Sequence, residues 1–97
     1  MAGGIKVNQV DTTVRFDRDF NKLPEEIKEH AKKCIASLLD DPMPSSIRFE
    51  KLRGFKNPNI FTIHVTSNHS HKASMEITDG VAILRRIRSH KLIDANP

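Results

Sequence analysis

The sequence predicts an α+β fold: a four- or five-stranded antiparallel sheet with one face packed by one long helix and a short helical turn. One stretch, residues 27–38, carries apolar side chains at helical spacing. Four later stretches, at about 46–53, 60–66, 71–78 and 81–88, alternate apolar and polar side chains as strands do. Only short connections separate these four stretches, which favours antiparallel neighbours.

Length and composition indicate a single domain over residues 1–97, in which residues 1–8 are expected to be a loose terminus. No apolar run reaches the roughly 18 residues that a membrane-spanning helix needs, and no signal-peptide pattern opens the chain. The single Cys34 cannot form an internal disulfide, so we expect a cytoplasmic, reducing compartment. The sequence has no Gly-rich phosphate loop and no CxxC pair, so we expect no cofactor.

The first elements can be placed from their local patterns. Residues 10–16 alternate apolar and polar side chains, which predicts the first strand. Asp17 is expected to cap a short turn or helix that runs to Phe20. Pro24 suits the first position of the main helix because its missing N–H would have no partner there. The run Asp40–Pro42 is expected to end that helix.

In the predicted sheet, a period of two assigns one set of side chains to the core. These are Ile47, Phe49, Phe61, Ile63, Val65, Ala73, Met75, Ile77, Val81, Ile83 and Ile87. Asp79–Gly80 is a strong hairpin signal, because both residues tolerate the positive φ that such a turn requires. Leu52 and Arg85 break the alternation, so we expect a β-bulge or an edge position at each.

The opposite face of the predicted sheet is expected to be open to water. It would carry Glu50, His64, Thr66, Lys72, Arg86, Arg88 and, by extension of the last strand, His90. An antiparallel sheet tolerates one wet face, so the pattern alone also fits a surface without function. The formal net charge is +4. The acidic residues concentrate in the first half of the chain, so the excess of positive charge lies in the second half, and this suits a polyanion or an acidic protein partner.

Metal chemistry has little support. His64, His69 and His71 have an H-x4-H-x-H spacing that matches no common ligand set, so we expect no metal site. Acid–base cleavage of RNA fits the residue types better, because attack by the 2′-OH needs a base, cations near the phosphate and an acid for the leaving oxygen.

The candidate residues for these roles lie on the predicted wet face and beside it. Glu50 or His64 could be the base, and His90 the acid, since histidine exchanges protons near neutral pH. The charge on the phosphate could be offset by Lys51, Arg53 or Arg86.

Several short motifs follow one another along the chain. They are Leu23–Ile27, Leu38–Pro42, Phe49–Gly54 with an LxG pattern, Ile63–Val65, Asp79–Gly80, and Leu84–His90 with an RI-x-S/T-H pattern. In their order and spacing, residues 12–94 resemble the RelE/ParE superfamily of bacterial type II toxins. The nearest branch is that of the ribosome-dependent mRNA endonucleases. The resemblance implies a RelE-like fold.

The resemblance also implies roles for individual residues. In the endonuclease branch, a Glu or His two residues before the Leu of LxG corresponds to Glu50, and a His in the following strand corresponds to His64. An Asp four residues further on corresponds to Asn68, so an acid is missing there. A His near the C-terminal end corresponds to His90, and Arg86 joins these residues in the expected catalytic set.

The same resemblance implies the partners. It implies a cognate antitoxin, and mRNA bound at the A site of the ribosome, with metal-independent cleavage and no membrane or small-molecule cofactor. The expected RNA contacts are Lys51, Arg53, Lys56, Asn68, Lys72, Arg88 and Lys91. The alternative is a non-catalytic relative that inhibits gyrase or only binds an antitoxin.

Overall fold

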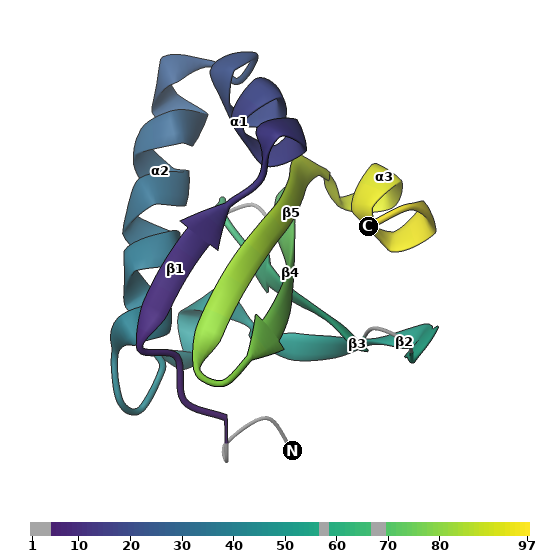
Figure 1. Ribbon diagram of the computed structural model, residues 1–97. Coiled ribbons are helices and arrows are strands. Elements are labelled where there is room, and N and C mark those ends of the chain that lie inside the picture. Colours follow the sequence, from purple (N-terminus) through teal and green to yellow (C-terminus); the bar gives the residue numbers. More distant parts are fainter. Residues whose placement is uncertain (1–4, 57–58, 67–69) are drawn as a thin grey trace.

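The computed structural model describes residues 5–56, 59–66 and 70–97, without the side chains of residues 53, 55 and 56. A five-stranded sheet has the order β1-β5-β4-β3-β2. The strands are β1 (Gln9–Thr12), β2 (Glu50–Lys56), β3 (Asn59–His64), β4 (His71–Thr78) and β5 (Val81–Ser89). The helices are α1 (Val14–Asn21), α2 (Glu25–Ala36) and α3 (His90–Ala95), with 3₁₀ turns at Ser37–Leu39 and Ser45–Ile47. Figure 1 shows α1 and α2 together on one side of the sheet and α3 on the other.

The four later strands form the predicted antiparallel meander, in which β2 pairs with β3, β3 with β4, and β4 with β5. The first strand differs, because β1 runs parallel to β5, from Gln9 opposite Val81 to Thr12 opposite Leu84. A parallel pair needs a long crossover, and here the two helices and three strands between β1 and β5 in the sequence supply it. The prediction of a purely antiparallel sheet is therefore wrong at the β1–β5 pair.

The stretch 10–16 divides between two elements instead of forming one strand. β1 ends before Thr13, and α1 begins at Val14. Thr13 caps the helix, because its Oγ1 accepts the N–H of Phe16 at 3.2 Å. The same hydroxyl donates to a carbonyl of β5 at 3.0 Å, which joins the helix start to the sheet. A short helix is present, as predicted, but it begins at Val14, before the predicted start, and its cap is Thr13 and not Asp17.

The main helix is close to its prediction. Pro24 is the N-cap of α2, one position before the place expected for it. The helix continues into a 3₁₀ turn in which Leu38 is fully buried, and Asp40 follows in an extended conformation. The predicted end of the helix is therefore confirmed.

The second predicted strand begins later than expected. Ser45–Ile47 forms a 3₁₀ turn, Arg48 adopts a left-handed conformation with φ of 49°, and β2 starts only at Glu50. The side chains still point as predicted, since Ile47 is buried. The ring of Phe49 stacks on that of Phe61 with centroids 5.3 Å apart.

The last hairpin confirms two predictions and corrects a third. Asp79 and Gly80 have φ of 50° and 79°, as the predicted turn requires. The pairing of β4 with β5 skips Arg85, which is the predicted bulge. The extra residue at the bulge reverses the face to which each side chain before it in β5 points. Ala82 and Leu84 therefore face the core, and the assignment of residues 81 and 83 to the core is wrong. A second register shift lies between residues 51 and 56 of β2, around the predicted irregularity.

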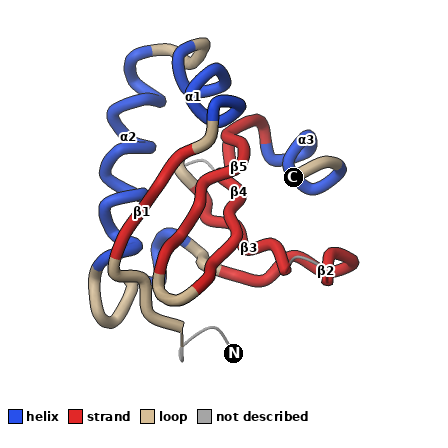
Figure 2. Tube along the Cα trace, in the orientation of Figure 1, coloured by secondary structure: helices blue, strands red, loops and turns tan. Residues whose placement is uncertain are grey.

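The main core lies between the sheet and the helices α1 and α2, which are the blue coils on one side of the red strands in Figure 2. Its buried members are Val7, Phe16, Ala31, Leu38, Ile47, Phe61, Ile63, Val65, Ala73, Met75, Ala82, Leu84 and Ile87. The helices among the described residues are all too short or too polar to cross a membrane.

Candidate active site

The sheet face opposite α1 and α2 carries polar side chains in two rows that cross the strands. The ladder pairs place Glu50, Thr62, Ser74 and Arg86 in one row, and His64, Lys72 and Arg88 in the next. Cβ atoms of directly opposite residues in a sheet lie about 5 Å apart, so each row is a set of side-chain neighbours. The alternation in the sequence therefore predicts correctly that Glu50, His64, Lys72 and Arg88 share this face.

Part of this face is closed off from water, however. The short helix α3 packs on β4 and β5 and covers one end of it (Figure 1). Thr62 and Ser74 are fully buried, Lys72 is 2% exposed and His64 is 8% exposed. The prediction that this face is open to water is therefore wrong for His64 and Lys72. The predicted extension of the last strand to residue 90 is also wrong, because the chain turns there into a helix that lies back on the sheet.

A continuous polar network forms beneath α3. The ammonium of Lys72 lies 2.8 Å from Oδ1 of Asp94 and 3.8 Å from Oε1 of Glu50. The other carboxylate oxygen of Asp94, Oδ2, lies 2.9 Å from Nε2 of His90. The ring of His90 faces the ring of His64, with centroids 5.4 Å apart and planes inclined by 58°. Glu50, His64 and His90 come from three separate elements and are thus connected through Lys72, Asp94 and the contact between the two histidine rings.

The network has an exposed side and a buried side. The side chain of Glu50 is 58% exposed and that of His90 is 46% exposed, so both can reach a ligand from solvent. Lys72 and His64 lie below them and are almost closed off. The arrangement can therefore present a carboxylate and an imidazole to a bound molecule, with the lysine holding the group together from inside.

Arg86 has a structural partner. Its Nε and Nη2 donate to the two carboxylate oxygens of Asp19 on α1, at 2.6 and 2.9 Å. Burial raises the pKa of Asp19, but the hydrogen bonds from Arg86 and from the Ile87 N–H, with the charges of Arg86 and Arg88, outweigh this and hold the pKa below its ordinary value. The guanidinium of Arg86 is thus bound to α1, which the prediction of a catalytic role did not foresee.

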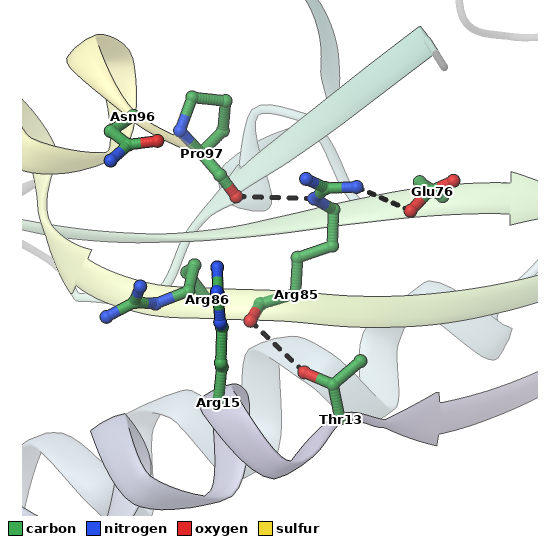
Figure 3. A pocket seen from close by; sticks show the side chains of 7 residues that line it. All are labelled: Thr13, Arg15, Glu76, Arg85, Arg86, Asn96 and Pro97. Carbon is green, nitrogen blue, oxygen red and sulfur yellow. Dashed lines mark hydrogen bonds and ion pairs between the residues drawn. The ribbon is translucent and has the colours of Figure 1, made fainter. Parts of the chain in front are cut away.

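A cavity of about 160 Å³ lies next to the bulge at Arg85 (Figure 3). Its walls are Thr13, Arg15, Glu76, Arg85, Arg86, Asn96 and Pro97. Arg85 pairs with Glu76 and also donates to the carbonyl of Pro97 at 3.4 Å, and the buried Ser74 hydroxyl donates to the same carbonyl at 2.9 Å. The C-terminal segment is therefore fixed to the sheet here. The sequence pattern does not identify Arg15, because the alternation over residues 10–16 predicts a strand where α1 begins.

The remaining predicted RNA contacts are spread around the site. Lys51 is exposed on β2, Lys91 is exposed on α3, and Arg88 is half-buried opposite the lysine of β4. The side chains of Arg53 and Lys56, and all of Asn68, lie outside the described residues, as does His69. Asp94 was not predicted at all. Its signal is the H-x3-D spacing with His90, which places both residues on one face only if the segment is helical.

The overall fold can be compared with known structures. No protein-family model matches this sequence, and no curated protein matches it either. Among solved structures, a chain of the RelB–RelE antitoxin–toxin complex of Methanococcus jannaschii is similar, with a TM-score of 0.65 and 22% identity over 90% of this chain and 99% of that one.

Two toxins of Escherichia coli are also similar. YafQ has a TM-score of 0.69 and 15% identity, over 87% of this chain and 94% of YafQ. The isolated RelE toxin has a TM-score of 0.64 and 21% identity, over 92% of this chain and 95% of RelE. These matches span nearly the whole chain, and the protein described here has the fold of the RelE-like toxins.

Proposed function

We propose that this chain is the toxin of a type II toxin–antitoxin pair and that it cleaves mRNA on the ribosome. The fold supports the first part, because similar structures come from toxin–antitoxin complexes of Methanococcus jannaschii and Escherichia coli. The observation that carries the second part is the connection of Glu50, His64 and His90 through Lys72, Asp94 and the contact between the two histidine rings.

The proposed reaction needs only side chains of this protein. The 2′ oxygen of the RNA attacks the adjacent phosphorus and gives its proton to Glu50, which is the more exposed of the two candidate bases. The bond from phosphorus to the 5′ oxygen breaks, and that oxygen takes a proton from the imidazolium of His90. The products are a 2′,3′-cyclic phosphate and a free 5′-OH. His64, whose ring contacts that of His90, supports the acid from below.

Cations near the site would bind the RNA backbone. Lys51, Arg88 and Lys91 are the described candidates, and the arginine-lined cavity beside the bulge adds Arg15. Arg53, Lys56 and Asn68 remain predictions from the sequence. Lys72 is too deeply buried to meet a phosphate in this conformation, since its ammonium is enclosed by two carboxylates.

The test is expression of the protein in cells followed by primer extension on a reporter mRNA. Wild-type protein is expected to leave cuts in phase with the codons, and His90→Ala is expected to abolish them. Leu92→Ala, an exposed change on the same helix, is the matched control and should cut normally. Codon-phased cuts that persist in His90→Ala would contradict the assignment of the acid.

The burial of His64 and Lys72 beneath α3 favours a second candidate, a non-catalytic protein of the same fold. Such a protein would inhibit DNA gyrase or bind only its antitoxin. Intact mRNA together with inhibited supercoiling of plasmid DNA in vitro would select the gyrase inhibitor, and growth that is unaffected by expression would select the inactive homologue.

The antitoxin partner has a suitable surface on the other side of the molecule. A groove of about 380 Å³ between β1, α1 and α2 is lined mainly by apolar side chains: Val10, Phe16, Phe20, Ile35, Ala36, Leu39 and Leu84, with Thr12, Asp17 and Lys32 beside them. Leu39 is 49% exposed there. We assign to this groove the apolar side of an antitoxin segment that folds on binding, while the net positive charge of the toxin attracts its acidic residues.

A further inference from the structure

One carboxylate, that of Asp94, connects the exposed and buried parts of the candidate active site. Its Oδ1 accepts from the ammonium of Lys72 at 2.8 Å, and its Oδ2 lies 2.9 Å from Nε2 of His90. His90 and Asp94 are four residues apart on α3, so both side chains lie on the same face of that helix, one turn apart. Each carboxylate oxygen therefore has a different partner.

The position of this carboxylate is set by the sheet more than by the helix. A helix of six residues is too short to be stable alone. It is fixed by the fully buried Ile93 and by Lys72, which projects from the interior strand β4 and is 2% exposed. Glu50, at 3.8 Å, holds the same ammonium from the other side. Asp94 is thus presented to His90 at a fixed place.

This contact favours one nitrogen of His90 for action on a substrate. Nε2 lies 2.9 Å from a carboxylate oxygen of Asp94, and an ionised carboxylate only accepts hydrogen bonds, so the contact favours the form of the ring in which Nε2 carries a proton. Nδ1 is then the nitrogen that exchanges its proton with another molecule. The ring of His64, 5.4 Å away, restricts rotation of the imidazole from a second side.

We infer that Asp94 is a positioning residue, which orients the imidazole of His90 and directs Nδ1 at the RNA. The inference rests on the proposed function and adds a specific assignment to it. Carboxylates that hold a working imidazole by its other nitrogen have this effect in many enzymes. Lys72 acts through the same contact, because it anchors Asp94 and does not itself reach the RNA.

The first test is spectroscopic and needs no ribosome. In ¹H–¹⁵N spectra of the purified protein, the Nε2 proton of His90 is expected to be visible and slow to exchange, because Asp94 holds it. The proton should disappear in Asp94→Ala and persist in Leu92→Ala, which changes an exposed side chain of the same helix. A proton that is missing in the wild-type protein, or unchanged in Asp94→Ala, would overturn the inference.

The second test separates catalysis from binding. In single-turnover cleavage on ribosomes loaded with mRNA, Asp94→Ala is expected to lower the maximal rate about 10–100-fold, as loss of an orienting partner does. The ribosome concentration that gives half the maximal rate should not change. Asp94→Glu, which keeps the charge, should recover part of the rate. An effect on binding alone, or an equal loss in Leu92→Ala, would show that α3 is merely structural.

Lys72→Met supplies a variant that keeps the size of the buried side chain and removes its charge. If the lysine acts through Asp94, the double variant with Asp94→Ala should be no slower than Asp94→Ala alone. Additive losses would mean that the lysine acts independently of the carboxylate, and would overturn that part of the inference.

The two proposals fail in different ways. A wild-type protein that leaves mRNA intact contradicts the proposed function and the role of Asp94 with it. A wild-type protein that cuts mRNA, together with an Asp94→Ala variant that cuts as fast, contradicts only the role of Asp94.

Discussion

Both faces of the sheet are covered by helices, but the two covers use different chemistry. On one face, α1 and α2 enclose an apolar core, and on the other α3 closes over a lysine, a histidine and two hydroxyl groups. Burial of apolar area is stabilising in proportion to the area removed from water. Burial of charge gains little net stability, because desolvation opposes the attraction between the partners. The difference indicates that one face maintains the fold and the other fixes the geometry of polar groups.

The cover on the polar face is also the smaller one. α3 has six residues, and besides Ile93 it is held by the contacts of Asp94 with Lys72 and of Pro97 with Ser74. A short segment with few apolar contacts belongs to the parts of a protein that open locally at low cost. The apolar face should therefore dominate global stability, while the polar face should respond in activity and local order.

The largest effect is expected from the apolar face. Ile63→Ala removes a fully buried side chain in β3 and leaves a cavity, so it should lower the free energy of unfolding by about 2–5 kcal/mol. Urea denaturation followed by circular dichroism measures this. Val14→Ala, at an exposed position of α1, is the control and should stay within about 0.5 kcal/mol of the wild type. Equal effects of the two changes would contradict the division between the faces.

The next effect concerns the ion pair that ties the polar face to α1. Asp19→Asn should cost about 1–3 kcal/mol at neutral pH, because Arg86 loses a charged, mostly buried partner. The folded-state pKa of Asp19 is lowered, so its contribution is present above the ordinary value near 3.8 and is lost as the pH falls through the folded pKa. The difference in urea midpoint between the wild type and the variant should therefore disappear at acid pH. A gap that is constant with pH would contradict the charge-based account.

A smaller effect is expected from the buried lysine. Lys72→Met should change the free energy of unfolding by no more than about 1 kcal/mol in either direction, since a well-packed apolar replacement avoids the desolvation of the ammonium. Its two carboxylate partners are 43% and 58% exposed, so water can solvate them once the lysine is gone. Calorimetry of the variant measures this. A decrease in the free energy of unfolding as large as that of Ile63→Ala would show that the polar face also contributes strongly to the stability of the fold.

The apolar face could largely be predicted from the sequence, because apolar spacing reflects a single preference for burial. The stripe of α2, the four later strands, the Asp79–Gly80 turn and the bulge at Arg85 all follow from local patterns. The error at 10–16 has a local cause too. A short alternation cannot distinguish a strand from the start of a helix, and here the cap made by Thr13 decides.

The polar face could be predicted only in part. The alternation places Glu50 and His64 correctly, but it says nothing about what covers them. The pair of Arg86 with Asp19 joins residues far apart in the chain, and the role of Asp94 depends on a helix that the pattern of the last strand concealed. Which polar side chains pair with each other depends on tertiary contacts, and no periodicity in the sequence predicts these pairs.

The smallest effect on stability is expected where the apolar face meets solvent, in the groove assigned to the antitoxin. Leu39→Glu changes a half-exposed side chain, so the free energy of unfolding should move by only about 0.5 kcal/mol. Binding of the co-expressed antitoxin should weaken, because a charge then has to be buried against an apolar segment. Isothermal titration with the purified proposed antitoxin measures this, and mRNA cleavage by the free protein should be unchanged. Unaltered affinity would show that the antitoxin binds elsewhere than in the groove. The apolar face would then contribute only to the stability of the fold.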